Sequence, residues 1–164
     1  MSLENLLAPE AILPSLRVNG KKQALQELSE KAAEVSGLPA REIFDAWMQR
    51  EKLNSTGLGD GIAIPHGKLL NAPRIFGIFA RLERGIDFEA LDGQPVDLLF
   101  GLIAPENAGA DHLKALAVIA RLLRNPATLA KIRATREAPA LYAILTQASP
   151  SSSPSSSPSS DAAA

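Results

Sequence analysis

The sequence predicts an α/β fold in which a mixed central β-sheet is flanked by helices. Residues 75–82 and 96–104 form nearly continuous apolar runs, which are typical of buried strands. Segments with apolar residues at helical spacing lie before and after these runs. An order of helices, then strands, then helices favours a sandwich of helices on one sheet.

The beginning of the chain is predicted to contribute little to the sheet. Residues 1–9 predict a short helical lead-in, and the apolar residues of 12–18 surround Pro14. Because proline cannot donate a hydrogen bond to a neighbouring strand, we expect any strand here to be short or at the sheet edge.

Two helices should follow. Over 21–35 the apolar residues recur at helical spacing, and Gly37 is placed to end that helix. Pro39 suits the first position of the next helix. The apolar face of this second helix includes Trp47, and we expect the helix to end at Arg50.

The second half of the chain should supply the sheet and the remaining helices. We expect a turn at 83–85 to interrupt the first apolar run, and the run 96–104 to form the central strand. Asp111 is predicted to cap a helix over 112–124. Further helices are predicted at 127–134 and 137–146.

The domain organisation follows from composition. Residues 1–147 are expected to form one domain, because 46% of the chain is hydrophobic and 21% charged, as in globular proteins. Residues 148–164 are mostly Ser, Pro and Ala, so we expect a disordered tail.

Charge and cysteine content exclude several classes of function. Seventeen basic and 18 acidic residues give a net charge of −1, which argues against nucleic acid or an anionic membrane as main partner. No cysteine is present, so disulfides and thiolate metal sites are excluded. The first residues lack a signal-peptide pattern, and no apolar run reaches the roughly 20 residues of a membrane helix. We therefore expect a cytoplasmic protein without membrane insertion.

The segment Ser55–Lys68 is the main candidate for a functional site. It holds one of only two histidines, His66, after a short apolar run at 62–64 that predicts a strand. His66 lies at a strand end between a proline, which restricts the backbone, and a glycine, which has no side chain to cover the imidazole. Such a histidine suits a nucleophile. We expect the loop around it to admit a partner, through Ser55, Thr56, Gly57, Gly59, Gly61, Pro65 and Gly67.

Phosphoryl transfer fits the remaining candidates. His112 lies in the first turn of a predicted helix, and Arg50 ends a helix that leads into the glycine-rich segment. A neutral imidazole can carry a phosphoryl group, while Arg50 and His112 stabilise its oxygens without a metal or other cofactor. The alternatives are that His112 is a solvated helix residue and that Arg50 is an ordinary surface charge.

Other motifs match poorly. The glycines do not follow the dinucleotide-binding or phosphate-loop spacing. Ser55 and Thr56 lack the glycine-flanked elbow of a hydrolase nucleophile, and a zinc site has no supporting ligand spacing.

The motif closely resembles a known family. The run from Arg50-Glu51-Lys52 through Ser55-Thr56-Gly57 to 61–68, with residues 94–100 and the His112-Leu113 pair, resembles mannitol/fructose-type enzyme IIA domains of the bacterial phosphotransferase system. It is most similar to their nitrogen regulatory branch, over about 3–146. The resemblance implies an α/β fold with a mixed sheet, and phosphorylation of His66 at Nε2 with Arg50 and His112 as companions.

The resemblance also implies partners. The phosphoryl donor would be an HPr-like histidine phosphocarrier, and the phosphorylated form would regulate target proteins, including potassium-uptake systems and sensor kinases, and nitrogen metabolism. We expect the donor to dock on an apolar rim that includes Leu58, Ile64 and Leu69. Two alternatives stay open: a fructose- or mannitol-specific subunit that passes phosphate to a transporter, and a binding module that is never phosphorylated.

Overall fold

The computed structural model describes residues 2–147, so the predicted tail at 148–164 lies outside the described residues. The elements are α1 (Leu3–Leu6), β1 (Ile12–Leu16), α2 (Lys21–Ser36), α3 (Ala40–Leu53), β2 (Gly57–Gly59), β3 (Ile62–Ala63), β4 (His66–Leu69), β5 (Phe76–Ile86), β6 (Val96–Pro105), α4 (Ala110–Leu123), α5 (Pro126–Arg133) and α6 (Ala138–Gln147).

One mixed sheet organises the molecule. Its order is β1-β5-β6-β3-β2, and β4 also pairs with β6. The β5–β6 and β2–β3 pairs are antiparallel, whereas β1–β5, β3–β6 and β4–β6 are parallel. The predicted fold class is confirmed, and β6 is the central strand that its apolar run predicted. The short β1, which contains Pro14, lies at the sheet edge as expected.

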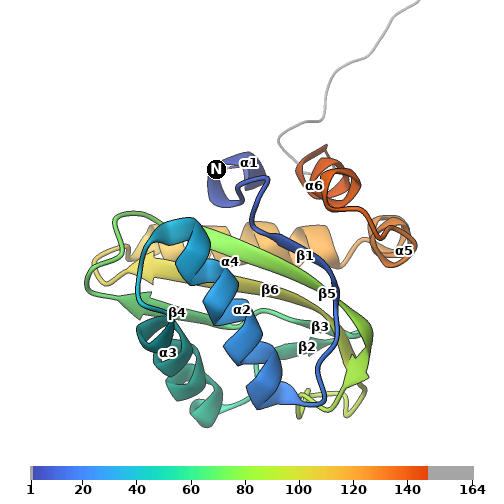
Figure 1. Ribbon diagram of the computed structural model, residues 1–164, viewed down its shortest axis with the longest axis horizontal. Helices are drawn as coiled ribbons and strands as arrows, with labels where there is room; N and C mark the ends of the chain where they lie inside the picture. Colours follow the sequence, from blue (N-terminus) through green and yellow to red (C-terminus); the bar gives the residue numbers. More distant parts are fainter. Residues whose placement is uncertain (1, 148–164) are drawn as a thin grey trace, which may run out of the picture.

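Helices cover both faces of the sheet (Figure 1). Helices α2 and α3 pack together on one face, against β5 and β4, and α4 packs against β6 on the other. Helices α1, α5 and α6 gather around α4 and the β1 edge. Gly37 ends α2 in the left-handed conformation, at φ 80°, as its position predicted.

Trp47 fixes α3 to the centre of the sheet. Its side chain is fully buried, and Nε1 donates a hydrogen bond to the Leu102 carbonyl at 3.0 Å. A Cβ on Gly101 would lie 2.7 Å from the indole, so only glycine allows this close approach. The helix that carries Arg50 is therefore held at a fixed distance from β6.

Three local predictions were wrong. Residues 83–85 do not interrupt the strand, because β5 runs to Ile86 with only a register irregularity between Arg81 and Ile86. Asp111 does not cap α4, which begins at Ala110 after Gly109. Helix α3 continues three residues past Arg50, which places Arg50 in its last turn.

Candidate active site

His66 lies at the junction of two short strands. It follows β3 after Ile64 and Pro65, as predicted, but it also begins β4, which the sequence did not predict. Strand β4 pairs in parallel with β6, with His66 opposite Leu102. The Pro65 carbonyl accepts a hydrogen bond from Leu102 N at 2.8 Å. The backbone on both sides of the histidine is therefore fixed by the central strand.

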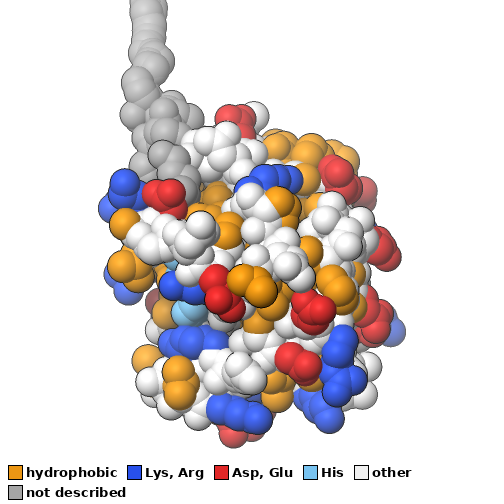
Figure 2. Space-filling model, turned by 90° about the vertical axis from the view of Figure 1, so that its left-hand side faces the viewer, with side chains coloured by type: hydrophobic (Ala, Val, Ile, Leu, Met, Phe, Trp, Pro, Cys, Tyr) orange, Lys and Arg blue, Asp and Glu red, His pale blue; other side chains and the backbone are white. Residues whose placement is uncertain are grey.

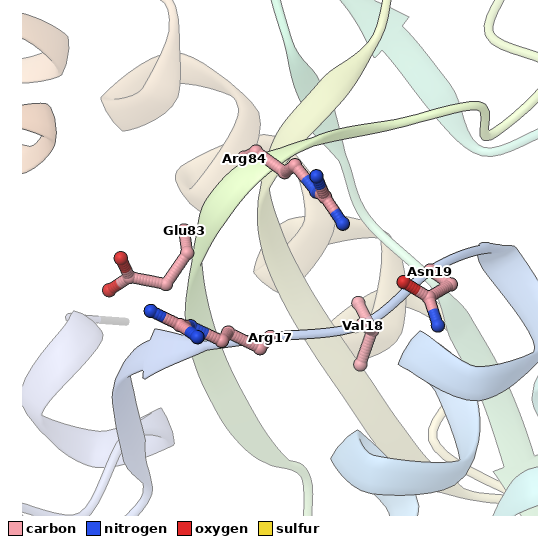
Figure 3. Close-up of a pocket in the computed structure, with 5 residues that line it drawn as sticks. All are labelled: Arg17, Val18, Asn19, Glu83 and Arg84. Atoms are coloured by element: carbon pink, nitrogen blue, oxygen red, sulfur yellow. The ribbon is translucent and has the colours of Figure 1, made fainter.

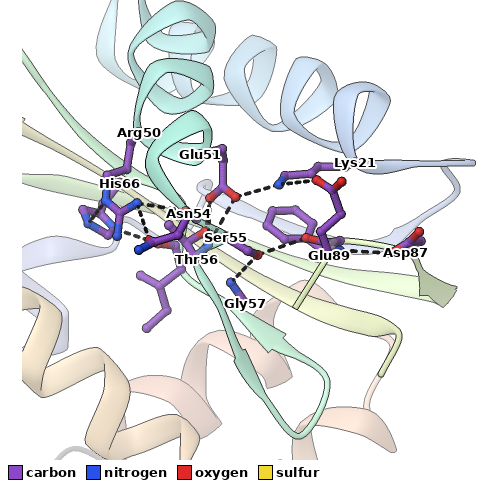
Figure 4. Close-up of polar contacts among 12 residues, drawn as sticks. Lys21, Arg50, Glu51, Asn54, Ser55, Thr56, Gly57, His66, Asp87 and Glu89 are labelled. Atoms are coloured by element: carbon purple, nitrogen blue, oxygen red, sulfur yellow. Dashed lines mark hydrogen bonds and ion pairs between the residues drawn. The ribbon is translucent and has the colours of Figure 1, made fainter. Parts of the chain in front are cut away.

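Both ring nitrogens of His66 have partners (Figure 4). Nδ1 lies 2.8 Å from the Ile64 carbonyl oxygen, and Arg50 Nε donates to Nε2 at 3.2 Å. A carbonyl can only accept, so the proton of the neutral ring belongs on Nδ1. The lone pair of Nε2 therefore points toward the guanidinium.

Asn54 holds Arg50 in this position. Arg50 Nη1 donates to the Asn54 carbonyl at 3.0 Å and to its side-chain Oδ1 at 3.2 Å. Asn54 was not among the predicted site residues. Its spacing of four residues after Arg50, at the end of a helix, is the signal that could have indicated it.

His112 lies beside His66. The ring centroids are 5.6 Å apart with an interplanar angle of 52°. His112 is only 7% exposed, which contradicts the alternative that it is a solvated helix residue. Its Nδ1 is buried and has no hydrogen-bond partner among the described residues. An unpaired buried nitrogen normally costs about 1–3 kcal/mol, so this position is not explained by stability alone.

The surroundings of both imidazoles favour the neutral form of the ring. Burial is the main cause that lowers the pKa of His66; the Arg50 charge adds to it and the Ile64 carbonyl opposes it. Burial lowers the pKa of His112 to about 4, with further contributions from His66 and Lys68. The arginine keeps its charge. The cluster thus combines one fixed cation with two neutral rings, and the unprotonated Nε2 of His66 accepts a hydrogen bond from that cation.

The family assignment rests on the whole domain. The family described as "Phosphoenolpyruvate-dependent sugar phosphotransferase system, EIIA 2" matches residues 5–148. The chain belongs to this EIIA family. A nitrogen regulatory protein from Bradyrhizobium diazoefficiens is 62% identical to this EIIA chain over 145 residues, covering 88% of the chain and 95% of the relative. One from Escherichia coli is 41% identical over 147 residues, covering 89% and 90%.

A solved structure agrees with the EIIA assignment. The nitrogen regulatory protein IIA-Ntr from Neisseria meningitidis superposes with a TM-score of 0.82 at 34% identity, covering 87% of this chain and 97% of that one. The mixed sheet with helices on both faces is therefore the fold of this EIIA branch.

The glycines of the EIIA motif shape a hairpin within the chain. Gly59 and Gly61 have φ values of 108° and 80° on either side of Asp60, where β2 turns into β3. A Cβ on Gly57 would lie 2.6 Å from that of Ala90, and one on Gly67 would lie 3.1 Å from that of Ala46 in α3. These glycines thus permit close internal packing, a role that the sequence interpretation did not include.

The two hydroxyl groups of the motif, on Ser55 and Thr56, form hydrogen bonds within the EIIA domain (Figure 4). Ser55 Oγ donates to the Phe88 carbonyl and accepts from Gly57 N, each at 3.0 Å. Thr56 is buried, and both its N–H and its hydroxyl donate to the Glu51 carboxylate. Glu51 was not among the predicted site residues.

The predicted apolar rim needs correction. Leu58 is 42% exposed, but Ile64 is only 4% exposed and belongs to the hydrophobic core. Leu69 is half-buried. More exposed leucines follow the site residues in the chain: Leu53, Leu70 and Leu113. Histidine atoms reach the surface among basic and hydrophobic side chains in Figure 2.

Other sites within the described residues lie apart from the histidines. A hollow of about 460 Å³ opens where the chain leaves β1 and diverges from β5 (Figure 3). It is lined by Arg17, Val18, Asn19, Glu83 and Arg84, so it shares no residue with the predicted site.

In the described range 2–147, no three His, Asp or Glu residues are grouped to hold a metal ion. None of the helices in that range is long and apolar enough to span a bilayer.

Proposed function

We propose that this EIIA chain is a phosphocarrier in which His66 Nε2 accepts a phosphoryl group from an HPr-like histidine phosphocarrier. The observation that carries the proposal is the fixed orientation of the His66 ring. Nδ1 is held by the Ile64 carbonyl, Nε2 faces Arg50, and the His112 ring lies 5.6 Å from the His66 ring between centroids. A neutral imidazole with one orientated lone pair is a competent nucleophile at pH 7.

The transfer is an in-line exchange of one P–N bond for another. The Nε2 lone pair attacks phosphorus, the P–N bond to the donor imidazole breaks, and its electron pair stays on the donor ring. The Arg50 guanidinium, which covers Nε2 in the free protein at 3.2 Å, turns to bind the phosphoryl oxygens. The neutral ring of His112 offers its own N–H to the same oxygens, and no metal or other cofactor takes part.

The donor is proposed to dock on the surface around His66. A protein donor needs an accessible apolar surface around the nucleophile. Leu53, Leu70 and Leu113 are exposed by 78%, 78% and 68%, and each lies within four residues of Arg50, His66 or His112 in the sequence. Cytoplasmic location of the chain belongs to this proposal, because the upstream phosphocarriers act there.

The output is proposed to be regulatory. The relatives from Bradyrhizobium diazoefficiens and Escherichia coli are named nitrogen regulatory proteins. Phosphorylation adds roughly two negative charges at the His66 site. A target that contacts this surface then distinguishes the two forms, and potassium-uptake components and sensor kinases are the targets that we propose to test.

Phosphotransfer from labelled phosphoenolpyruvate through purified upstream carriers tests the proposal. The wild-type chain should be labelled and His66→Ala should not. Arg50→Ala should label about 10²–10³ times more slowly, as when one preorganised donor is removed. Arg41→Ala is the matched control, since Arg41 lies on the same helix with its side chain 84% exposed. An unlabelled wild-type chain would favour a binding module.

The same labelled chain separates regulation from sugar delivery. Rapid loss of label to purified IIB subunits of fructose or mannitol transporters would favour the sugar-specific alternative. Retained label, together with capture of a target by only one form in a pull-down against His66→Ala, favours regulation.

A further inference from the structure

Glu51 is a buried carboxylate next to the site. Its side chain is 3% exposed, although it directly follows the partly exposed Arg50 on α3. Lys21 Nζ from the start of α2 lies 2.8 Å from Oε1. Thr56 N lies 3.2 Å from each carboxylate oxygen, and Thr56 Oγ1 donates to Oε2. Burying a charge this deeply is unfavourable unless its partners are well placed, so all these contacts are needed.

These contacts continue to the His66 ring. The Thr56 carbonyl accepts a hydrogen bond from Ile64 N at 3.1 Å. The Ile64 carbonyl in turn lies 2.8 Å from His66 Nδ1. The carboxylate of Glu51 is therefore linked to the imidazole through one threonine and one backbone unit.

The hydrogen bond from Arg50 to His66 Nε2 depends on the same segment of the chain. Arg50 Nη1 is held by Asn54, two residues before Thr56. Because Glu51 fixes Thr56 from one side of α3, it also limits the movement of Asn54 and of the last turn that carries Arg50. Figure 4 shows Arg50, Glu51, Asn54 and Thr56 together around this end of the helix.

We propose that Glu51 is a positioning residue that, through Thr56 and Ile64, holds the Nδ1–H tautomer and the orientation of His66. The importance of this role for phosphoryl transfer rests on the proposed function above. Glu51 touches neither the reacting nitrogen nor the phosphoryl group. Its negative charge also raises the pKa of His66 and so opposes the larger effect of burial.

Glu51→Gln tests the role with little change in shape. A glutamine presents one oxygen and one NH₂ group, and Lys21, which can only donate, requires the oxygen. The NH₂ group then takes the place of Oε2, so the Thr56 hydroxyl loses its acceptor and Thr56 N–H keeps only one of its two acceptor oxygens. We expect the labelling rate to fall about 10–100-fold, the loss typical of a misplaced reacting group. In ¹⁵N spectra of the unphosphorylated protein, the His66 ring should shift from one tautomer to a mixture.

Glu89→Gln is the matched control. Glu89 contacts the same Lys21 Nζ, at 3.3 Å, but its side chain is 76% exposed. Removing its charge should leave both the labelling rate and the tautomer unchanged. Equal effects of the two substitutions would overturn the proposal, because they would assign the effect to the charge balance of Lys21.

Thr56 provides an independent test if Glu51→Gln does not fold. Thr56→Val removes the hydroxyl bond to Glu51 and keeps the side-chain shape, so it should shift the tautomer in the same direction. Thr56→Ser keeps the hydroxyl and should restore the single tautomer. A slower Glu51→Gln or Thr56→Val protein with an unchanged His66 tautomer would show only a structural role.

Separate measurements decide the proposed function and the role of Glu51. If the wild-type chain accepts no phosphoryl group, the proposed function fails. The ¹⁵N measurement on unphosphorylated protein still decides whether Glu51 holds the ring.

Discussion

The buried neutral state of His112 predicts a specific dependence of stability on pH. Its pKa is lowered to about 4 in the folded protein, against about 6.5 in an unfolded chain. Between these values the unfolded chain binds more protons, so the free energy of unfolding must fall as the pH falls. Replacing His112 with glutamine, which does not titrate, removes this contribution.

The difference between the two pKa values sets how far the free energy of unfolding falls. Between pH 7 and pH 5 the proton uptake of His112 on unfolding lowers the free energy of unfolding by about 2 kcal/mol. Solvent at the edge of the site screens part of this effect, so we expect a loss of about 1–2 kcal/mol. The stability of the wild-type chain should therefore fall by that much more than the stability of His112→Gln over the same pH range. The remaining pH dependence, from His66 and the carboxylates, is common to both proteins.

Urea unfolding at a series of pH values between 7 and 5 measures the difference. The comparison uses the slope with pH, so any constant cost of the substitution cancels. Parallel curves for the two proteins would refute the reasoning, because they would mean that His112 takes up no proton on unfolding. A wild-type curve that falls less steeply than the variant curve would contradict its sign.

Three further substitutions test contacts that stabilise the fold. Gly101→Ala should lower the free energy of unfolding by about 1–3 kcal/mol in urea and slow the labelling of His66, because the new methyl group lies 2.7 Å from Trp47 and displaces α3. Asn125→Ala should lower it by about 1 kcal/mol without slowing labelling, because the side chain caps α5 through two backbone N–H groups. Arg133→Met should cost about 1–2 kcal/mol in the same assay, because it breaks a two-pronged contact with Asp97 and the bond to the hairpin carbonyl. An Asn125→Ala protein that labels slowly, or an Arg133→Met protein as stable as wild type, would contradict these assignments.

Where burial decides the structure, the sequence was informative. The apolar run of β6 and the helical periodicity of α2 directly reflect which side chains face the core, and both elements formed as predicted. Residues 83–85 look like a turn, yet β5 continues through them. Its first part pairs with both β1 and β6, and Ile86 beyond these residues still pairs with Val96 of β6. Strand β4 has no apolar alternation; its pairing with β6 is a long-range contact that local pattern cannot reveal.

The candidate site was predictable in part for a similar reason. The Pro65-His66-Gly67 sequence is an unusual local signal, and the structure brings that histidine together with Arg50 and His112. Glu51 and Lys21 resemble ordinary charges on helix surfaces. Their burial depends on how α2 and α3 pack together, which no spacing within either helix indicates.

The position of the phosphoryl group tests the central claim most directly. The chain should be phosphorylated through its upstream carriers and examined by ³¹P and ¹⁵N NMR without denaturation. We predict a single phosphohistidine, bonded through Nε2 of His66, with Nδ1 still protonated toward the Ile64 carbonyl. A phosphoryl group on Nδ1, on His112 or on no histidine at all would contradict the account.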